Sequence, residues 1–360
     1  MKTVRELRLY RWYKYLKIIY RDQDRKPITR IFKEFLTLSL KHKRLPTHYF
    51  TSFLYKKPIE NYEDYLTTDE IAELQEMLCD PITVDICHNK LLFQEYFENR
   101  NIRLPRLLAY NFGPNILIKE NGQWLLNDIK ELASLRGVMA EVVAKSDRAS
   151  VFIKPICGSS GGGAQKIIGK NPEWAMEITE QLHKKIVSGA FLFQEEVKQH
   201  RELAKLNPTS LNTIRIDVFK ENDGSTDIIS AFLRMGLAGN YIDNVAAGGI
   251  FVGINLADGR FRGQALNKLR KGGTAYVAHP DSGVIFKDFE IPYFPEVKRL
   301  ALEASEYLPP ALIGWDIAVS QDGPVLVEGN AVYYDMQLSD IAFGGYRRNP
   351  IFQKLKKYLK

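Results

Sequence analysis

The sequence predicts an α+β fold, and three observations support that class. Residues 1–80 show mainly helical periodicity, short apolar runs bounded by turn residues dominate after residue 210, and few helices separate those runs. A doubly wound parallel sheet would instead need strands and helices to alternate throughout. With 360 residues, the chain is long enough for two or three packed subdomains.

The composition is that of a soluble globular protein. The apolar content of 45% and the charged content of 26% are ordinary for that class, and no run approaches the roughly 20 apolar residues that span a bilayer. The first residues are too highly charged for a secretory signal peptide. Cys79, Cys87 and Cys157 lack the spacing of a metal site, so we expect free thiols in a reducing cytoplasm.

The first predicted unit, residues 1–80, is a basic and mainly helical extension. Thr68 is the predicted cap of a helix in the stretch LTTDEIAELQEM, because apolar residues follow it at helical spacing. Residues 1–60 hold 16 Lys and Arg against 5 Asp and Glu, although the net charge of the whole chain is only +7. The basicity therefore belongs to this extension and not to the main body.

The uneven charge leaves four interpretations of the extension open. Its basic residues interleave with apolar ones such as Trp12 and Leu16. Such a segment suits a solvated helix that caps the main domain, an anionic membrane surface, a protein partner such as a glycosyltransferase, or nucleic acid. This pattern disfavours nucleic acid as the partner, because the main body lacks a basic stripe that would continue the footprint.

Three further units are predicted along the chain. Residues 81–150 form an N-terminal α/β subdomain, in which a helix precedes a short strand approached by Pro105. Residues 151–210 form a small lid subdomain, in which a hairpin of strand, glycine-rich loop and strand is followed by a helix and the strand AFLFQEEV. Residues 211–360 form a C-terminal subdomain of strands, closed by a hairpin whose turn is SQDG.

Lys154 ends the first strand of the lid, directly before the glycine-rich loop. Glycines let backbone N–H groups approach an anion closely, and a lysine adds a point charge, so phosphate is the expected guest. A flexible hairpin turn is the alternative, because neither a Walker A sequence nor a G-x-G-x-x-G that opens a helix is present. Cys157 is expected to pack beneath the loop rather than to act as a nucleophile.

Acids and bases occur within the apolar strands of the C-terminal subdomain. Asp316 and Glu328 lie on the two strands of the final hairpin, and Asn330 follows. Their hard oxygen ligands suit Mg²⁺, which prefers one or two carboxylates completed by nucleotide phosphates. Arg215 and Arg234 need anions in turn, either a phosphate or carboxylate ligand or structural acids.

Three other stretches each permit two interpretations. The end of AFLFQEEV is either an exposed strand end or a backbone segment that binds adenine near residues 195–197. Asn244, in DNVAAGG, is either a loop residue or part of the charged cluster. His279, in AHPDSG, either acts as a base or substrate ligand or stabilises a turn.

The order of these motifs resembles the ATP-grasp superfamily. It runs from Lys90 in HNKLLFQEYFENRNIRLP through FIKPICGSSGGG, FQEEV and Arg234 with Asn244 to WDIAVSQDGPVLVEGN. The stretches LNTIRI, DNVAAGG, HPDSG and GWDIAVSQDGPVLVEGN are similar to the sugar-transfer-associated ATP-grasp group. The resemblance covers roughly residues 85–335. One departure is Asn89, where many relatives have an acid before the lysine.

The resemblance implies an ATP-grasp fold, in which a nucleotide is held between two α+β subdomains, and a role for each matching residue. The phosphates of ATP would contact Lys90 and Lys154. The loop covering the β- and γ-phosphates would comprise Ser159, Ser160, Gly161, Gly162 and Gly163. The remainder of the nucleotide site would comprise Gln194, Glu195, Glu196, Val197 and Asn244. Magnesium, as one or two ions that manganese can replace, would be held by Asp316, Glu328 and Asn330. The catalytic residues would be Arg234, Arg215 and His279.

The function expected from the resemblance is an ATP-dependent carboxylate–amine ligase that acts through an acyl phosphate. Its substrates would be small carboxylates and amines, with an amino acid joined to a sugar or sugar acid in cell-surface polysaccharide biosynthesis. The expected location is the cytoplasm, with peripheral attachment at the inner face of the membrane. The alternatives are an ATP-grasp kinase that phosphorylates a hydroxyl and a degenerate nucleotide-binding scaffold. The scaffold is disfavoured because the metal carboxylates, lysines and arginines are all present.

Overall fold

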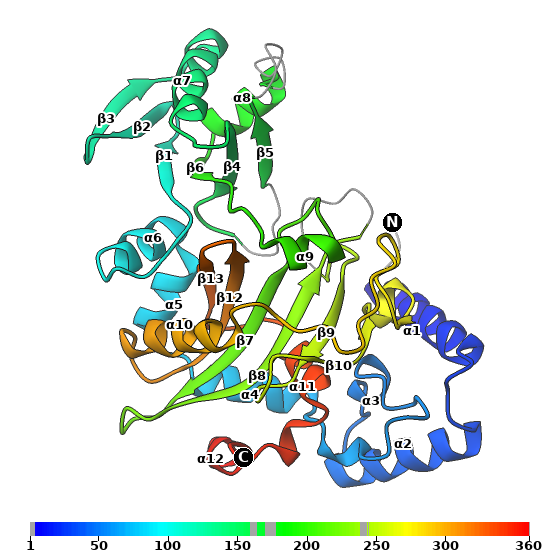
Figure 1. Ribbon diagram of the computed structural model, residues 1–360. Coiled ribbons are helices and arrows are strands. Elements are labelled where there is room, and N and C mark those ends of the chain that lie inside the picture. Colours follow the sequence, from blue (N-terminus) through cyan, green and yellow to red (C-terminus); the bar gives the residue numbers. More distant parts are fainter. Residues whose placement is uncertain (1–3, 159–163, 170–177, 238–242, 244, 360) are drawn as a thin grey trace.

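A computed structural model describes residues 4–158, 164–169, 178–237, 243 and 245–359 (Figure 1). Helices form the N-terminal part, and two antiparallel sheets follow. The N-terminal helices are α1 (Val4–Arg21), α2 (Ile28–His42), α3 (His48–Thr51), the 3-10 helix η1 (Tyr62–Asp64), α4 (Thr68–Met77), α5 (Pro81–His88) and α6 (Lys90–Glu98). The mixture of segregated helices and antiparallel strands confirms the predicted α+β class.

The first sheet contains six strands within the described residues, in the order β3-β2-β1-β6-β4-β5. They are β1 (Leu107–Phe112), β2 (Asn115–Glu120), β3 (Gln123–Asp128), β4 (Ser150–Pro155), β5 (Gln165–Ile168) and β6 (Ala190–Glu195). Helices α7 (Leu132–Ala144) and α8 (Glu180–Val187) contribute to its core. Because β1 pairs with β6, strands from both sides of the expected boundary at residue 150 share one sheet. The β4–β5 hairpin around the glycine-rich loop forms as predicted.

The second sheet contains seven strands within the described residues, in the order β11-β10-β9-β8-β7-β12-β13. They are β7 (Thr213–Lys220), β8 (Thr226–Met235), β9 (Ile250–Ile254), β10 (Phe261–Leu266), β11 (Ala275–Tyr276), β12 (Leu312–Ser320) and β13 (Gly323–Asn330). The remaining helical segments are α9 (Arg201–Leu206), η3 (Leu269–Lys271), α10 (Phe294–Glu306), α11 (Met336–Phe343), η4 (Tyr346–Arg348) and α12 (Phe352–Lys356).

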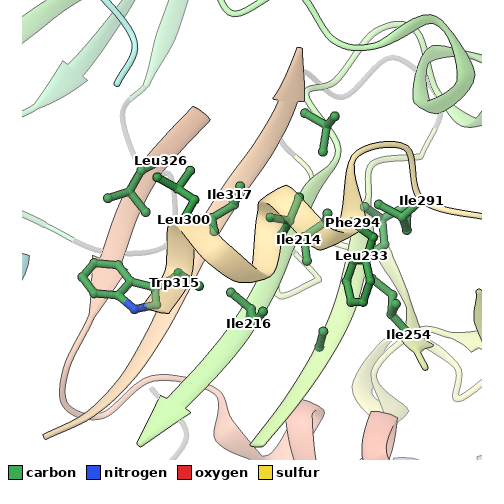
Figure 2. Packing of buried hydrophobic residues seen from close by; sticks show 14 of the residues in the cluster. Ile214, Ile216, Leu233, Ile254, Ile291, Phe294, Leu300, Trp315, Ile317 and Leu326 are labelled. Carbon is green, nitrogen blue, oxygen red and sulfur yellow. The ribbon is translucent and has the colours of Figure 1, made fainter. Parts of the chain in front are cut away.

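Alternation along the strands separates the two faces of the second sheet. In β7, Ile214 and Ile216 point to a buried apolar face, while Arg215 lies between them and points to the other face, since successive side chains alternate. Figure 2 shows these isoleucines packed with Leu233 and Trp315 beneath α10. Burial of each such side chain contributes about 1.5–3 kcal/mol. The apolar face anchors the sheet, and the opposite face is free to carry charge.

Of two local predictions, the structure confirms one and shows that the other is wrong. The final hairpin has the predicted tight turn, because Ser320 pairs with Gly323 across a two-residue loop and Gly323 adopts a positive φ of 109°. The predicted cap Thr68 is wrong by one position. Thr67 is the N-cap, because its side chain accepts from the Glu70 amide while the Glu70 carboxylate accepts from the Thr67 amide.

No helix in the described part of the chain combines the length and the hydrophobicity that crossing a bilayer requires.

Candidate functional site

A cleft of about 970 Å³ is lined by residues from both sheets. It brings together most of the residues predicted from the sequence. Those that line it are Lys90, Lys154, Gln194, Glu195, Glu196, Val197, Arg215, Arg234, Asp316, Glu328 and Asn330. Ser159, Ser160, Gly161, Gly162, Gly163 and Asn244 lie outside the described residues.

The buried carboxylate of Asp316 is the electrostatic centre of the cleft. Arg215 donates to both of its oxygens, from Nε at 2.7 Å and from Nη2 at 3.1 Å. The Nη2 atom of Arg234 lies 3.1 Å from Oδ2 of the same carboxylate. Burial raises the pKa of Asp316, but the two guanidinium groups outweigh it and lower the pKa below its usual value. The carboxylate therefore stays ionised and holds two cations.

Strand register creates this cluster from residues distant in sequence. Asp316 pairs directly with Arg215 on β7 and with Glu328 on β13, so all three share one row across the sheet. Arg215 in turn faces Phe232 on β8, and Arg234 follows two residues later on the same face. The amide of Asn330 completes the group, because its Nδ2 lies 3.4 Å from Asp316 and 3.1 Å from the Gly314 carbonyl.

Lys90 joins the hairpin to the start of α6. Its Nζ lies 3.2 Å from the Glu328 carboxylate and donates to the Gly158 carbonyl at 2.8 Å. The preceding residue, Asn89, caps α6, since its Oδ1 accepts from the amides of Leu91 and Leu92. The departure from the family pattern at this position thus preserves a helix cap, which an acid would also provide.

Lys154 projects into the cleft from β4 without an acidic hydrogen-bond partner among the described residues. Burial lowers its pKa to about 8, although Glu328 and Asp316 oppose the shift. An anionic ligand placed beside it would favour the protonated form. A half-buried lysine that is only partly compensated by the protein is thus suited to bind the phosphate group predicted from the sequence.

The end of β6 offers its backbone to the cleft. The Glu195 side chain instead accepts from Arg106, from the Asp147 amide and from Ser146. Burial raises the pKa of Glu195, but these hydrogen bonds and the charge of Arg106 outweigh it and lower the pKa below its usual value. In the described part of the chain, no hydrogen bond uses the Val197 amide, although Val197 lines the cleft.

The side chains on either side of that segment are likewise held by the protein. Glu196 forms an ion pair with Lys166 at 2.5 Å, and the Gln194 amide donates to Gln94 at 2.8 Å. These contacts fix the strand end. The Glu195 and Glu196 amides also donate to the Arg106 and Ser150 carbonyls, so the Val197 amide is the backbone donor that can recognise a flat polar ligand.

The surroundings of His279 do not suit catalysis. His279 is buried outside the residues that line the cleft, its Nδ1 accepts from the Asp281 amide, and its Nε2 lies 3.1 Å from the Gly236 carbonyl. Burial lowers the pKa of His279. Of its two interpretations, the geometry favours a turn-stabilising residue. Cys157 is exposed, and the loop beneath which we expected it to pack lies outside the described residues.

The carboxylate and amide oxygens of the cleft are of the kind that magnesium prefers. Glu328 and Asn330 line the cleft and are partly accessible, whereas Asp316 is 2% exposed and already holds two arginines. The described residues contain no group of three or more His, Cys, Asp and Glu that would form an all-protein metal cage. Magnesium commonly takes one or two carboxylates and completes its coordination with phosphate oxygens and water, which matches this set.

Sequence reasoning missed several charged residues of the cleft. Asp243 is buried, accepts from the Thr213 amide and hydroxyl, and lies 3.5 Å from Nε of Arg234. Burial raises the pKa of Asp243 despite that arginine. Lys268 and Arg270 also line the cleft. The only signal for Asp243 was its place beside Asn244 in a glycine-rich stretch, and no motif pointed to the two basic residues.

The chain matches a known family over most of its length. A family model described as sugar-transfer associated ATP-grasp matches residues 71–350. No curated protein matches the chain at a significant level.

Solved structures of similar shape are remote in sequence. The ATP-grasp ligase PsnB with a minimal precursor is 13% identical with a TM-score of 0.41, over 78% of this chain and 64% of that chain. D-alanyl-alanine synthetase A from Vibrio cholerae is 13% identical with a TM-score of 0.42, over 81% and 73%. L-amino acid ligase from Bacillus licheniformis is 10% identical with a TM-score of 0.40, over 72% and 43%. The chain thus spans less than two thirds of the length of PsnB.

Replacing the central carboxylate tests the electrostatics of the cleft. Asp316→Asn leaves the buried guanidinium of Arg215 without its anion and removes one of the two acids beside Arg234, so we expect the free energy of unfolding to fall by about 3–5 kcal/mol. The same substitution at Asp147, whose side chain is 84% exposed beside Arg106, should cost less than about 1 kcal/mol. Urea unfolding measures both, and equal losses would show that Asp316 is not a buried ion-pair centre.

Proposed function

The chain belongs to the sugar-transfer-associated ATP-grasp family, and from that premise we propose that it is an ATP-dependent ligase that joins a carboxylate to an amine. One observation carries the proposal. A single cleft gathers an oxygen-ligand set for magnesium, two arginines on a buried carboxylate and a half-buried lysine. This combination suits a nucleoside triphosphate, whose negative charge must be neutralised on several sides.

We place the nucleotide along the cleft from β6 to β13. Adenine would rest against residues 195–197, where the Val197 amide has no partner among the described residues. The phosphates would extend toward Lys154 and Lys90. The loop of residues 159–163, which joins β4 and β5, would cover them. Magnesium, held by Glu328, Asn330 and Asp316, would supply positive charge to the phosphate oxygens.

The proposed reaction has two steps, both without a protein nucleophile. An oxygen of the substrate carboxylate attacks the γ-phosphorus of ATP, so that one O–P bond forms, the bond to ADP breaks and an acyl phosphate results. The amine nitrogen then attacks the carbonyl carbon, a C–N bond forms, phosphate leaves and the nitrogen loses a proton. Catalysis comes mainly from positioning and charge neutralisation.

Arg234 is the arginine best placed to contact the reacting groups. Its side chain is 16% exposed, against 6% for Arg215, whose guanidinium is held by both oxygens of Asp316. We therefore propose that Arg234 contacts the transferred phosphoryl group and that Arg215 orients Asp316. His279 would hold the turn beside Gly236 and not act as a base.

The substrates we propose are an amino acid and a sugar or sugar acid, in the assembly of cell-surface polysaccharide. The support is the family description, which associates the group with sugar transfer.

Product analysis separates the ligase from a kinase on the same fold. A ligase releases ADP, phosphate and an amide, whereas a kinase releases ADP without free phosphate.

We also propose peripheral contact of the N-terminal extension with an anionic membrane. Four apolar side chains spaced by four residues on α2 face solvent, with exposures of 57% for Ile28, 68% for Phe32, 46% for Leu36 and 71% for Leu40. Residues 1–60 also carry a surplus of basic residues, with 16 Lys and Arg against 5 Asp and Glu. An amphipathic helix with basic surroundings is suited to the interface of an anionic bilayer.

Removing a proposed metal ligand tests the nucleotide site. In Glu328→Gln, we expect the magnesium-dependent increase in melting temperature with ATP to be lost and the affinity for the magnesium–ATP complex to fall about tenfold. Glu98→Gln, which affects an exposed carboxylate paired with Lys119, should behave as wild type. An unchanged magnesium-dependent shift in Glu328→Gln would refute the metal assignment.

The pH dependence of ATP binding tests Lys154. Its pKa of about 8 means that the ligand-free protein loses this charge as the pH rises through 8, while bound phosphates favour the protonated form. ATP affinity should therefore be greatest below pH 8 and fall by up to about tenfold per pH unit above it. Lys154→Arg, which stays charged, should give a flat profile over this range. Identical profiles for the two proteins would contradict the assignment.

Liposome co-sedimentation tests the membrane contact. We expect binding to vesicles that contain phosphatidylserine but not to pure phosphatidylcholine, and weaker binding as salt is added. The double variant Phe32→Gln and Leu40→Gln should bind about tenfold more weakly, while Leu126→Gln, at an exposed position of β3, serves as the control. Equal binding of the double variant and wild type would remove this role of α2.

A further inference from the structure

The cleft continues past Arg234, away from the end at β6 where we place the adenine. Its volume of about 970 Å³ is at the upper end of the range of about 300–1,000 Å³ for small-molecule sites. The strand order shows where the additional part lies. Arg234 on β8 faces Phe251 on β9, and Phe251 faces Leu266 on β10. Lys268 follows two residues after Leu266, so it lies just beyond the end of β10, which is two strands over from β8 in the sheet.

This distal end of the cleft has an apolar floor and a cationic rim. Phe232, Val245 and Leu338 line it and belong to one buried cluster. Lys268 and Arg270 line the same end, and Lys268 forms an ion pair with Asp335. Arg270 donates to the Ala246 carbonyl at 3.1 Å and is exposed. No described acidic residue forms an ion pair with Arg270.

The loop that carries these two cations has a fixed shape. The Asn267 side chain accepts from the Thr274 amide at 2.8 Å and donates to the Lys271 carbonyl at 3.2 Å. The Gly273 amide closes the loop on the Lys268 carbonyl at 3.3 Å. Gly273 has a positive φ of 64°, which disfavours a side chain. Lys268 and Arg270 are therefore presented from a defined turn and not from a loose tail.

Residues of the N-terminal extension pack against this turn. Leu269, between the two cations, is 2% exposed and packs in one cluster with Leu38, Phe53 and Tyr55 of the extension. Figure 1 shows η3 beside α1. The extension also holds α11, because Gln337 donates to the hydroxyls of Thr51 and Ser52 at 2.9 Å each.

We propose that the distal end of the cleft binds an anionic group of the substrate, a phosphate or a carboxylate, through Arg270 and Lys268. Residues before 67 set the position of these side chains through Leu269, which is a positioning residue. The inference rests on the proposed function, because it assigns the part of the same cleft that the nucleotide leaves free. The extension lies largely outside the family match at residues 71–350, so this chain shapes its own substrate subsite.

Inorganic phosphate and malonate are the probes, added to the full chain saturated with magnesium and the non-hydrolysable ATP analogue AMPPNP. The analogue fills the γ-phosphate position, so any further stabilisation reports a second anion site. We expect phosphate or malonate to raise the melting temperature of wild type, and the more effective anion identifies the group that the subsite takes. In Arg270→Gln, the half-saturating concentration should rise about tenfold, as expected for loss of a charge-assisted contact.

Three controls separate this subsite from other effects. Arg299→Gln removes an exposed arginine outside the cleft and should leave anion binding unchanged. Leu269→Ala should weaken anion binding as Arg270→Gln does, while Leu269→Met restores it and AMPPNP affinity stays at the wild-type value in both. Absence of AMPPNP binding would contradict the proposed function. Normal AMPPNP binding without stabilisation by either anion, or full stabilisation of Arg270→Gln, would overturn the subsite alone.

Discussion

A buried carboxylate that holds two guanidinium groups organises the functional face of this protein. Asp316 is only 2% exposed, and burying its ionised carboxylate would be costly if Arg215 and Arg234 were not both within hydrogen-bond distance. These three residues come from β12, β7 and β8, and Glu328 faces Asp316 from β13. The ion pairs of Asp316 therefore tie three adjacent strands together and fix the positions of the groups that would contact a nucleotide.

The two faces of the second sheet have different roles. The isoleucines of β7 and the core beneath α10 supply the stability, while the alternate residues of the same strand carry charge. The first sheet contributes Lys154 and the end of β6 to the opposite wall of the cleft. The N-terminal helices add a third component, since they pack beneath the turn that carries Lys268 and Arg270.

Local patterns in the sequence predicted much of this architecture. They could not predict which residues far apart in the sequence contact one another. The hairpin around SQDG and the β4–β5 hairpin follow from turn residues between apolar runs. The pairing of both arginines with Asp316 depends on strand register across segments about 80–100 residues apart, which no local pattern encodes. The shared sheet of β1 and β6 was missed for the same reason. His279 and Lys268 also show the limit, because burial and loop packing decide their surroundings.

A crystal structure of the chain with magnesium and AMPPNP would examine the whole arrangement at once. We expect magnesium at about 2.0–2.1 Å from oxygens of Asp316, Glu328 and Asn330, the γ-phosphate beside Arg234 and Lys154, and adenine against residues 195–197. A nucleotide bound elsewhere, with Glu328 and Asn330 free of metal, would show that the Asp316 cluster is only a structural ion-pair network.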